Sequence, residues 1–232
     1  MKQTLFLLGF ISVAATAGAQ QVSVGYPPQA SPFRDLEYHQ ELTAFGGYFN
    51  AAEDPGGVAP QAAPMAGIRY DIGVGGPMQL FARFAEAFSD RKVIDPTKPA
   101  DSRNLGKQSW PVYMADFGLS LNLTGQRSWH GVVPVTYLGV GVASDGGKKV
   151  EADPYRLGTT FAISYAAGLR FVPGGRFQIR ADIGSYMYKI NYPTGYYIKA
   201  SDNTQVLADK QARSFWKRNG AYTLGLSYSL FR

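Results

Sequence analysis

Residues 159–188 read TTFAISYAAGLRFVPGGRFQIRADIGSYMY, two periodic segments joined by the turn Pro173–Gly175. In each segment, alternate residues are mostly apolar or aromatic, and the residues between them are mostly small, polar or charged. Period-two alternation is typical of β-strands with two different faces, and the Pro-Gly-Gly sequence predicts a tight hairpin turn. Both segments reach the roughly 9–11 residues that a tilted strand needs to cross the hydrocarbon of a bilayer. The stretch therefore predicts a β-hairpin long enough to span a membrane.

The same alternation extends along most of the chain. It predicts an all-β protein with strands at 41–51, 66–74, 78–88, 112–123, 132–143, 159–171, 176–188 and 221–231. The fifth segment is apolar on both faces, so its inward face is left open. The connections alternate between short turns and long loops, as in outer-membrane barrels, where the short turns are periplasmic. We predict an eight-stranded antiparallel up-and-down transmembrane β-barrel.

The N-terminus has the three parts of a secretory signal peptide. Lys2 precedes an apolar run from Leu5 to Val13, and small residues follow at Ala17–Ala19. The run is shorter than the roughly 20 residues of a transmembrane helix. We expect a signal peptide over 1–19, an irregular N-terminal tail over 20–40 and the barrel over 41–232. The chain has no cysteine, which excludes disulfides, thiolate metal sites and a cysteine nucleophile.

Alternation alone does not decide whether the apolar face points outward. The alternative is a soluble, lipocalin-like periplasmic barrel that encloses an apolar ligand. The polar faces contain Arg, Asp and small residues, whereas a solvent-exposed surface normally carries many Lys and Glu. We therefore predict that the polar faces point inward and form an ion-paired plug, because buried charges need partners. The predicted plug residues are Arg69, Asp71, Arg83, Asp116, Arg170, Arg180 and Asp182.

The last predicted strand carries a family resemblance. Thr223–Leu230 reads TLGLSYSL, with the polar, glycine and alternate apolar positions of the outer-membrane β-signal. Aromatic residues near the ends of the predicted strands are typical of girdles at the two membrane interfaces. By pattern and architecture the chain resembles the small OmpA- and OmpX-type outer-membrane barrels over about residues 41–232. It is closer to the barrel-only members, without a peptidoglycan-binding domain.

The resemblance implies a monomer in the cell outer membrane, inserted by the barrel-assembly machinery. It also implies an envelope structural or interaction role, or passage of small solutes. The fold does not select among these roles.

No group of residues predicts catalysis. The two histidines, His39 in the tail and His130 in a predicted turn, lack a nucleophile and an orienting carboxylate at plausible positions. No glycine run matches a phosphate-binding loop, and the Asp, Asn and Gly residues of the connections lack the spacing of a calcium-binding loop. We therefore expect no enzyme activity, cofactor or metal. The net charge of +6 is a modest excess. We expect no nucleic-acid partner, because an exported chain would need a basic face with interleaved aromatics.

The last long connection is rich in cations. Arg and Lys are suitable partners for the phosphates of lipopolysaccharide in the outer leaflet. We predict contacts with lipopolysaccharide through Arg213, Lys217 and Arg218, with a solvated loop as the alternative. Outer-membrane lipid and lipopolysaccharide are therefore the expected partners.

Overall fold

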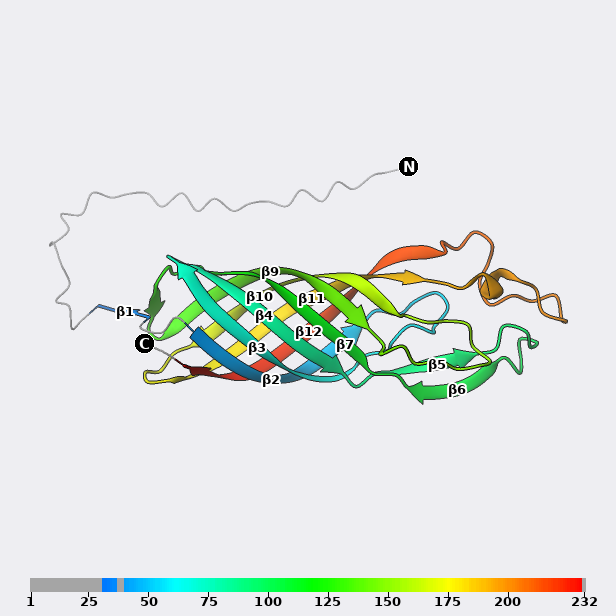
Figure 1. Ribbon diagram of the computed structural model, residues 1–232, viewed down its shortest axis with the longest axis horizontal. Coiled ribbons are helices and arrows are strands. Elements are labelled where there is room, and N and C mark those ends of the chain that lie inside the picture. Colours follow the sequence, from blue (N-terminus) through cyan, green and yellow to red (C-terminus); the bar gives the residue numbers. More distant parts are fainter. Residues whose placement is uncertain (1–30, 37–39, 231–232) are drawn as a thin grey trace, which may run out of the picture. The chain divides into compact units, whose positions relative to one another are not determined.

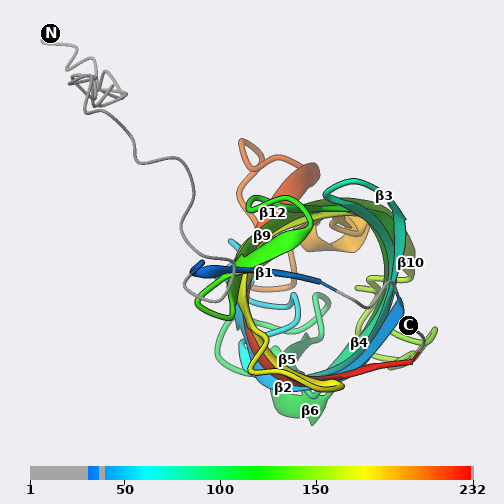
Figure 2. The ribbon, with the colours of Figure 1, turned by 90° about the vertical axis from the view of Figure 1, so that its left-hand side faces the viewer.

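The computed structural model describes residues 31–36 and 40–230. The predicted signal peptide, most of the tail and His39 lie outside the described residues. Eight long strands pair with their neighbours in antiparallel fashion and close into a barrel (Figures 1 and 2). In order around the barrel they are β2 (Gln40–Ala51), β3 (Ala63–Gly75), β4 (Met78–Ala87), β7 (Val112–Asn122), β9 (Val132–Ser144), β10 (Thr159–Phe171), β11 (Phe177–Asn191) and β12 (Ser214–Ser229).

The barrel closes where the last strand pairs with the first. β12 runs antiparallel to β2 from Asn219↔Ala51 to Ser229↔Glu41, and the Leu230 N–H donates to the Gln40 carbonyl at 2.9 Å. Closure gives hydrogen-bond partners to the backbone N–H and C=O groups that an open edge would expose. A sheet surrounded by lipid requires such closure, because lipid offers no hydrogen-bond partners. The predicted eight-stranded antiparallel barrel is confirmed.

Four shorter strands lie outside the barrel wall. β1 (Phe33–Asp35) pairs with β8 (Arg127–Trp129) at the short-turn end, so the tail predicted to be irregular contains a strand. β5 (Asp90–Ile94) and β6 (Asn104–Ser109) form a hairpin at the other end, within a connection predicted as loop. Helical structure in the described part of the chain is a single 3-10 turn, η2 (Thr194–Tyr197). No helix among these residues is long and apolar enough to cross a membrane.

The hairpin of β11 and β12 is longer than predicted. β12 begins at Ser214 rather than at residue 221, and its pairing with β11 runs out to Asn191↔Ser214. The added residues do not show a simple apolar-polar alternation, because they lie beyond the apolar belt. Backbone pairing with the neighbouring strand continues the ladder there.

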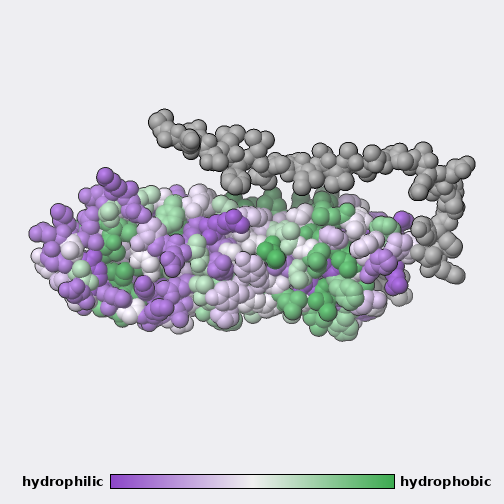
Figure 3. Space-filling model, turned by 180° about the vertical axis from the view of Figure 1, so that it is seen from behind, coloured by the Kyte–Doolittle hydropathy of each residue, from purple (hydrophilic) through white to green (hydrophobic). Residues whose placement is uncertain are grey.

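The outward face of the barrel is apolar. Large apolar side chains from every barrel strand are exposed on it, among them Leu42, Ile68, Leu80, Phe117, Leu138, Leu169, Ile183 and Leu224. Figure 3 shows hydrophobic side chains on the barrel wall, with hydrophilic ones predominating at the loop end. A lipocalin-like barrel would have the reverse arrangement. In β9, whose inward face the sequence left open, Val133, Val135 and Tyr137 are buried inside, and Leu138 faces outward.

Candidate functional site: a plugged interior and a folded loop cap

Eight charged side chains fill the lower part of the barrel, toward the short turns. All seven predicted plug residues are buried here, and Glu41 joins them. Four arginines thus meet four carboxylates, and each arginine forms at least one ion pair. We call this group the ionic plug: Glu41, Arg69, Asp71, Arg83, Asp116, Arg170, Arg180 and Asp182.

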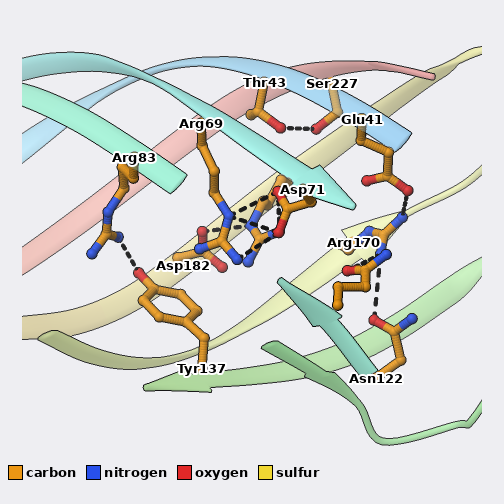
Figure 4. A network of polar contacts seen from close by, with 12 residues as sticks. Glu41, Thr43, Arg69, Asp71, Arg83, Asn122, Tyr137, Arg170, Asp182 and Ser227 are labelled. Carbon is orange, nitrogen blue, oxygen red and sulfur yellow. Dashed lines mark hydrogen bonds and ion pairs between the residues drawn. The ribbon is translucent and has the colours of Figure 1, made fainter. Parts of the chain in front are cut away.

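The part of the plug nearest the short turns is built around Arg170. Its guanidinium forms an ion pair with Glu41 (Figure 4). It also donates to the Gln178 side-chain carbonyl at 2.8 Å. Longer hydrogen bonds of 3.3 Å reach Gln79 and Asn122. Sequence reasoning missed Glu41, because Gly46 and Gly47 blur the alternation of that strand. Its signal was the shared parity with Thr43, which is also buried.

The centre of the plug is a chain of alternating charges. Arg69 contacts Asp71 through Nε at 2.8 Å and through Nη2 at 2.7 Å. Arg180 donates from Nε to Asp182 at 2.7 Å, and its Nη1 lies 3.7 Å from the Asp71 carboxylate. Asp71 therefore lies between two guanidinium groups, which supplies the partners that a buried carboxylate needs.

The third part of the plug combines charge with aromatic rings. Arg83 binds the two oxygens of Asp116 at 3.0 and 2.7 Å and donates to the Tyr137 hydroxyl at 2.5 Å. The guanidinium of Arg69 lies 4.1 Å from the centre of the Phe81 ring. Cations are attracted to aromatic faces, especially away from water. This contact accounts for an aromatic residue, Phe81, among the inward polar positions of its strand.

The centre of the plug leaves little free space. A cavity of about 10 Å³ touches Thr43, Arg69 and Arg180, room for roughly one water. Gly118 and Gly139 lie opposite each other on neighbouring strands, and a Cβ on Gly139 would come within 2.7 Å of both the Phe81 ring and Ser164. Inward glycines therefore give the large side chains the room that they occupy.

The upper part of the interior is apolar and aromatic. Phe49, Met114, Tyr188 and Ile190 are fully buried there. They belong to one hydrophobic cluster with side chains from the long connections, including Val58, Leu157, Tyr192, Tyr196 and Leu207. We call the connections 52–62, 88–111, 145–158 and 192–213 the loop cap. Its core is continuous with the core of the upper barrel.

Buried Asp153 ties three segments of the loop cap together. Its carboxylate accepts from the Arg91 guanidinium at 2.6 Å and from the Tyr196 hydroxyl at 2.7 Å. It also accepts from the backbone N–H groups of Ile94 at 3.1 Å and Tyr155 at 2.9 Å. The Arg91 guanidinium in turn lies 4.0 Å from the centre of the Trp110 ring.

Two further aspartates connect the remaining segments. Asp54 accepts from the Tyr192 hydroxyl at 2.6 Å, which joins the first connection to the last. Asp145 accepts from Trp110 Nε1 at 3.1 Å and from the Leu157 N–H at 3.0 Å. The loop cap is therefore a folded unit held by buried polar contacts across long sequence separations.

The carboxylates also affect the proton equilibria of the cap. Burial, together with a hydrogen bond to Asp54, raises the pKa of Tyr192 far above its usual range. Burial and Asp153 do the same to the pKa of Tyr196. Both hydroxyls therefore remain hydrogen-bond donors well into alkaline pH.

Lys217, one of the three predicted lipopolysaccharide contacts, points into the barrel and not toward the membrane, so this prediction is wrong. Arg213 and Arg218 are exposed, but Lys217 is only 4% exposed and faces Tyr188 inside the barrel. Because β12 already begins at Ser214, alternation turns Lys217 inward between outward Trp216 and Arg218.

Lys189, which the sequence did not single out, is exposed on the outward face next to this group and pairs in register with Trp216. Arg218 donates from Nε to the Ser185 hydroxyl at 3.1 Å and lies over the Tyr165 ring at 5.8 Å. These contacts fix the guanidinium at the upper rim of the apolar belt.

No metal site is found between residues 31 and 36 or 40 and 230, where no three His, Cys, Asp or Glu side chains are grouped to hold an ion. His130 lies at the end of β8 with a positive φ of 48° and packs edge-on against Trp129. His39 lies outside the described residues.

Comparison with known proteins gives the class of the fold. The chain matches no protein-family model. No curated protein matches its sequence. Its structure is similar to that of the outer-membrane protein OprG from Pseudomonas aeruginosa, with 11% identity, a TM-score of 0.51 and coverage of 85% of this chain and 99% of OprG. This likeness shows that the chain has the fold of a small outer-membrane β-barrel.

Two weaker similarities are to other small barrels. The N-terminal β-barrel domain of Pseudomonas aeruginosa OprF has 11% identity and a TM-score of 0.47, over 84% of this chain and 98% of that domain. Neisserial surface protein A has 12% identity and a TM-score of 0.42, over 86% and 98%.

Proposed function

We propose that this chain is a non-enzymatic protein of the outer membrane whose folded loop cap serves as an interaction surface outside the cell. The observation that carries the proposal is the contrast between the two ends of the interior. The lower part is filled by paired charges, whereas the long connections form a packed unit with its own core and buried hydrogen bonds. A folded surface loses little conformational entropy on binding a partner, which favours recognition.

The outward apolar belt supports residence in the outer membrane. Its exposed side chains would be unfavourable in water, because large exposed apolar patches on soluble proteins are rare. A closed barrel without free edges is compatible with a monomer. The predicted signal peptide and β-signal fit export and insertion by the barrel-assembly machinery.

The first test is where the protein resides and which end is accessible. Outer membranes should contain a band that migrates faster on gels when the sample is not boiled, as folded barrels do. Protease added to intact cells should cut within the loop cap or not at all, and never at the short turns. A soluble periplasmic protein without heat-modifiable migration would overturn the proposal.

Passage of small solutes is the second candidate, and conductance separates it from the first. The plug and its small cavity favour a closed interior. We expect the full-length barrel to show no steady ion current in planar bilayers at neutral pH. A constant single-channel current would instead favour a conducting barrel.

Lipopolysaccharide is the proposed lipid partner. Support comes from the outward cations Lys189, Arg213 and Arg218, close to aromatic residues at the rim of the belt. Replacing all three with glutamine should reduce the lipopolysaccharide that co-purifies with the protein. Lys217→Gln is the matched control, because this lysine faces inward and its loss should leave lipopolysaccharide unchanged. Equal co-purification by the triple variant would refute the contact.

A further inference from the structure

The loop cap contains a pocket to which no role has been assigned so far. It lies between the first connection and the β5–β6 hairpin and has a volume of about 630 Å³, within the roughly 300–1,000 Å³ typical of small-molecule sites. Its two cations, Lys92 and Lys107, come from the hairpin, and the opposite wall is chain 51–62.

The two lysines are arranged in an unfavourable way. Lys92 and Lys107 are directly opposite each other in the register of β5 and β6, so both side chains are on the same face. Like charges in this position destabilise a pair of strands. Neither ammonium group forms an ion pair with an acid in the described part of the chain.

The opposite wall brings backbone close to one of the lysines. Gly57 has a φ of +64°, and a Cβ built on it would lie 3.7 Å from Lys92 Nζ. Alanine, glycine and proline form most of the remaining wall, at Ala52, Gly56 and Pro60 among others. Few bulky side chains line the pocket, so its chemistry is set by its charged groups, among them the two ammonium groups.

Two acids, Glu53 and Asp54, also line the pocket and balance the formal charge of the two lysines. The Asp54 carboxylate is already engaged by the Tyr192 hydroxyl and by the N–H groups of Val58 and Ala59. Glu53 is exposed and forms no ion pair among the described residues. Neither acid forms an ion pair with Lys92 or Lys107 among the described residues, so one dianionic group between the two ammonium groups would relieve their mutual repulsion.

We propose that this pocket binds a phosphate or sulfate group held between the ammonium groups of Lys92 and Lys107. The group belongs either to a small free solute or to the headgroup of lipopolysaccharide, whose phosphates have the same chemistry. The proposal rests on the loop cap's role as an interaction surface and names the chemistry that this surface recognises.

The test uses the folded full-length barrel in zwitterionic detergent free of lipopolysaccharide, titrated calorimetrically with inorganic pyrophosphate at low salt. We expect saturable binding with one site, weakened at least about tenfold in Lys92→Gln/Lys107→Gln, because both charge-assisted contacts are lost. Glu53→Gln should strengthen binding, since it removes the negative charge beside the site. Lys148→Gln/Lys149→Gln, which changes two exposed lysines of another connection, is the matched control and should bind as the wild type does.

A purely structural role for the lysines gives a different result. Because the two cations repel each other, the double variant should unfold at the same temperature as wild type or higher. A lower unfolding temperature, the absence of saturable binding, or equal binding by the double variant and the wild type would overturn the proposal. Heat-modifiable migration of the same samples reports the barrel separately, so failure of this site is distinguishable from failure of the proposed function.

A second experiment distinguishes the two possible sources of the anion. The protein is placed in nanodiscs of phosphatidylcholine with or without lipopolysaccharide, and pyrophosphate binding is measured in both. Loss of binding only in discs with lipopolysaccharide identifies a lipid phosphate as the occupant. Equal binding in both identifies a free solute, and each of these results requires the site to exist.

Discussion

The lower and upper halves of the barrel interior differ in chemistry although the same eight strands enclose both. Below, four arginines and four carboxylates form ion pairs, both within single strands and between different strands of the wall. Above, aromatic and aliphatic side chains from the wall pack with side chains from the loop cap. The lower half is completed by the strands alone, whereas the upper half is incomplete without the connections.

The two halves of the interior therefore obtain their stability from different contacts. A charge buried in the plug needs an opposite charge within reach, so the loss of one partner should affect the whole barrel. The aspartates of the loop cap hold segments that could open while the barrel stays closed. Local opening of this kind is the general behaviour of segments with fewer buried contacts. We therefore expect global effects from changes in the plug and local effects from changes in the cap.

The largest expected effect is that of Asp71→Asn. The substitution leaves Arg69 and Arg180 without their shared carboxylate inside the barrel. Breaking a buried ion pair from one side costs about 3–5 kcal/mol, so the free energy of unfolding in urea should fall by that amount. Asp101→Asn, at an exposed position of the cap, is the control and should change it little. Equal effects of the two substitutions would show that the plug charges are not buried.

Asp153→Asn should have the next largest effect, confined to the loop cap. The change removes the anionic partner of Arg91 and weakens the hydrogen bonds to Tyr196 and two backbone N–H groups. We expect a loss of about 2–4 kcal/mol of local stability. Hydrogen exchange should accelerate in residues 88–111 and 145–158, with heat-modifiable migration unchanged. A variant that no longer forms a heat-modifiable barrel would contradict the separation of cap and plug.

The raised pKa values of Tyr192 and Tyr196 predict how the stability of the loop cap depends on pH. Their folded-state pKa values are raised, so the unfolded chain loses these protons first, near pH 10. The contribution of the two hydroxyls is thus fully present below pH ~10 and falls above it, by up to about 1.4 kcal/mol per tyrosine and pH unit. Absorbance of tyrosinate should show at least two fewer tyrosines titrating near pH 10 in wild type than in the unfolded chain, because burial also raises the pKa of Tyr155 in the cap.

The corresponding substitution isolates this effect. Tyr192→Phe/Tyr196→Phe should reduce the alkaline loss of protection in the cap, measured as hydrogen exchange relative to the barrel strands, and leave only the part due to buried Tyr155. If protection in wild type begins to fall already near pH 8, the hydrogen bonds to Asp54 and Asp153 do not hold the protons as described.

The smallest expected effect is that of Lys217→Met in the upper half. Lys217 Nζ is buried and has no hydrogen-bond partner among the described residues. Replacing an isolated buried cation with an apolar side chain of similar length should leave stability unchanged or raise it by roughly 0–1 kcal/mol. Arg83→Met in the plug should instead be strongly destabilising. A large loss from Lys217→Met would show that this lysine has a counter-ion.

Much of the barrel could be predicted because alternation is a local property of the chain. In 176–183, apolar residues alternate with polar or charged ones, so both the strand and its inward face followed from neighbouring residues. Where the alternation is blurred, the prediction failed or was left open. The inward position of Glu41 was not predicted, because Gly46 and Gly47 interrupt the alternation of its strand. Lys217 was assigned to a loop, because the first residues of β12 lie beyond the apolar belt and do not alternate.

The sequence by itself determined the eight strands, the tight turns, the alternation of loop lengths and the inward position of most charges. The tertiary structure decided which charges meet, since Arg170 and Glu41 come from strands far apart in the chain and are brought together only by closure. It also decided that the long connections fold over one core, through aspartates whose partners lie in other connections. The physical reason is the distance along the chain over which each property is set. Periodicity depends on adjacent residues, whereas the partners of a buried charge depend on the packing of the whole barrel.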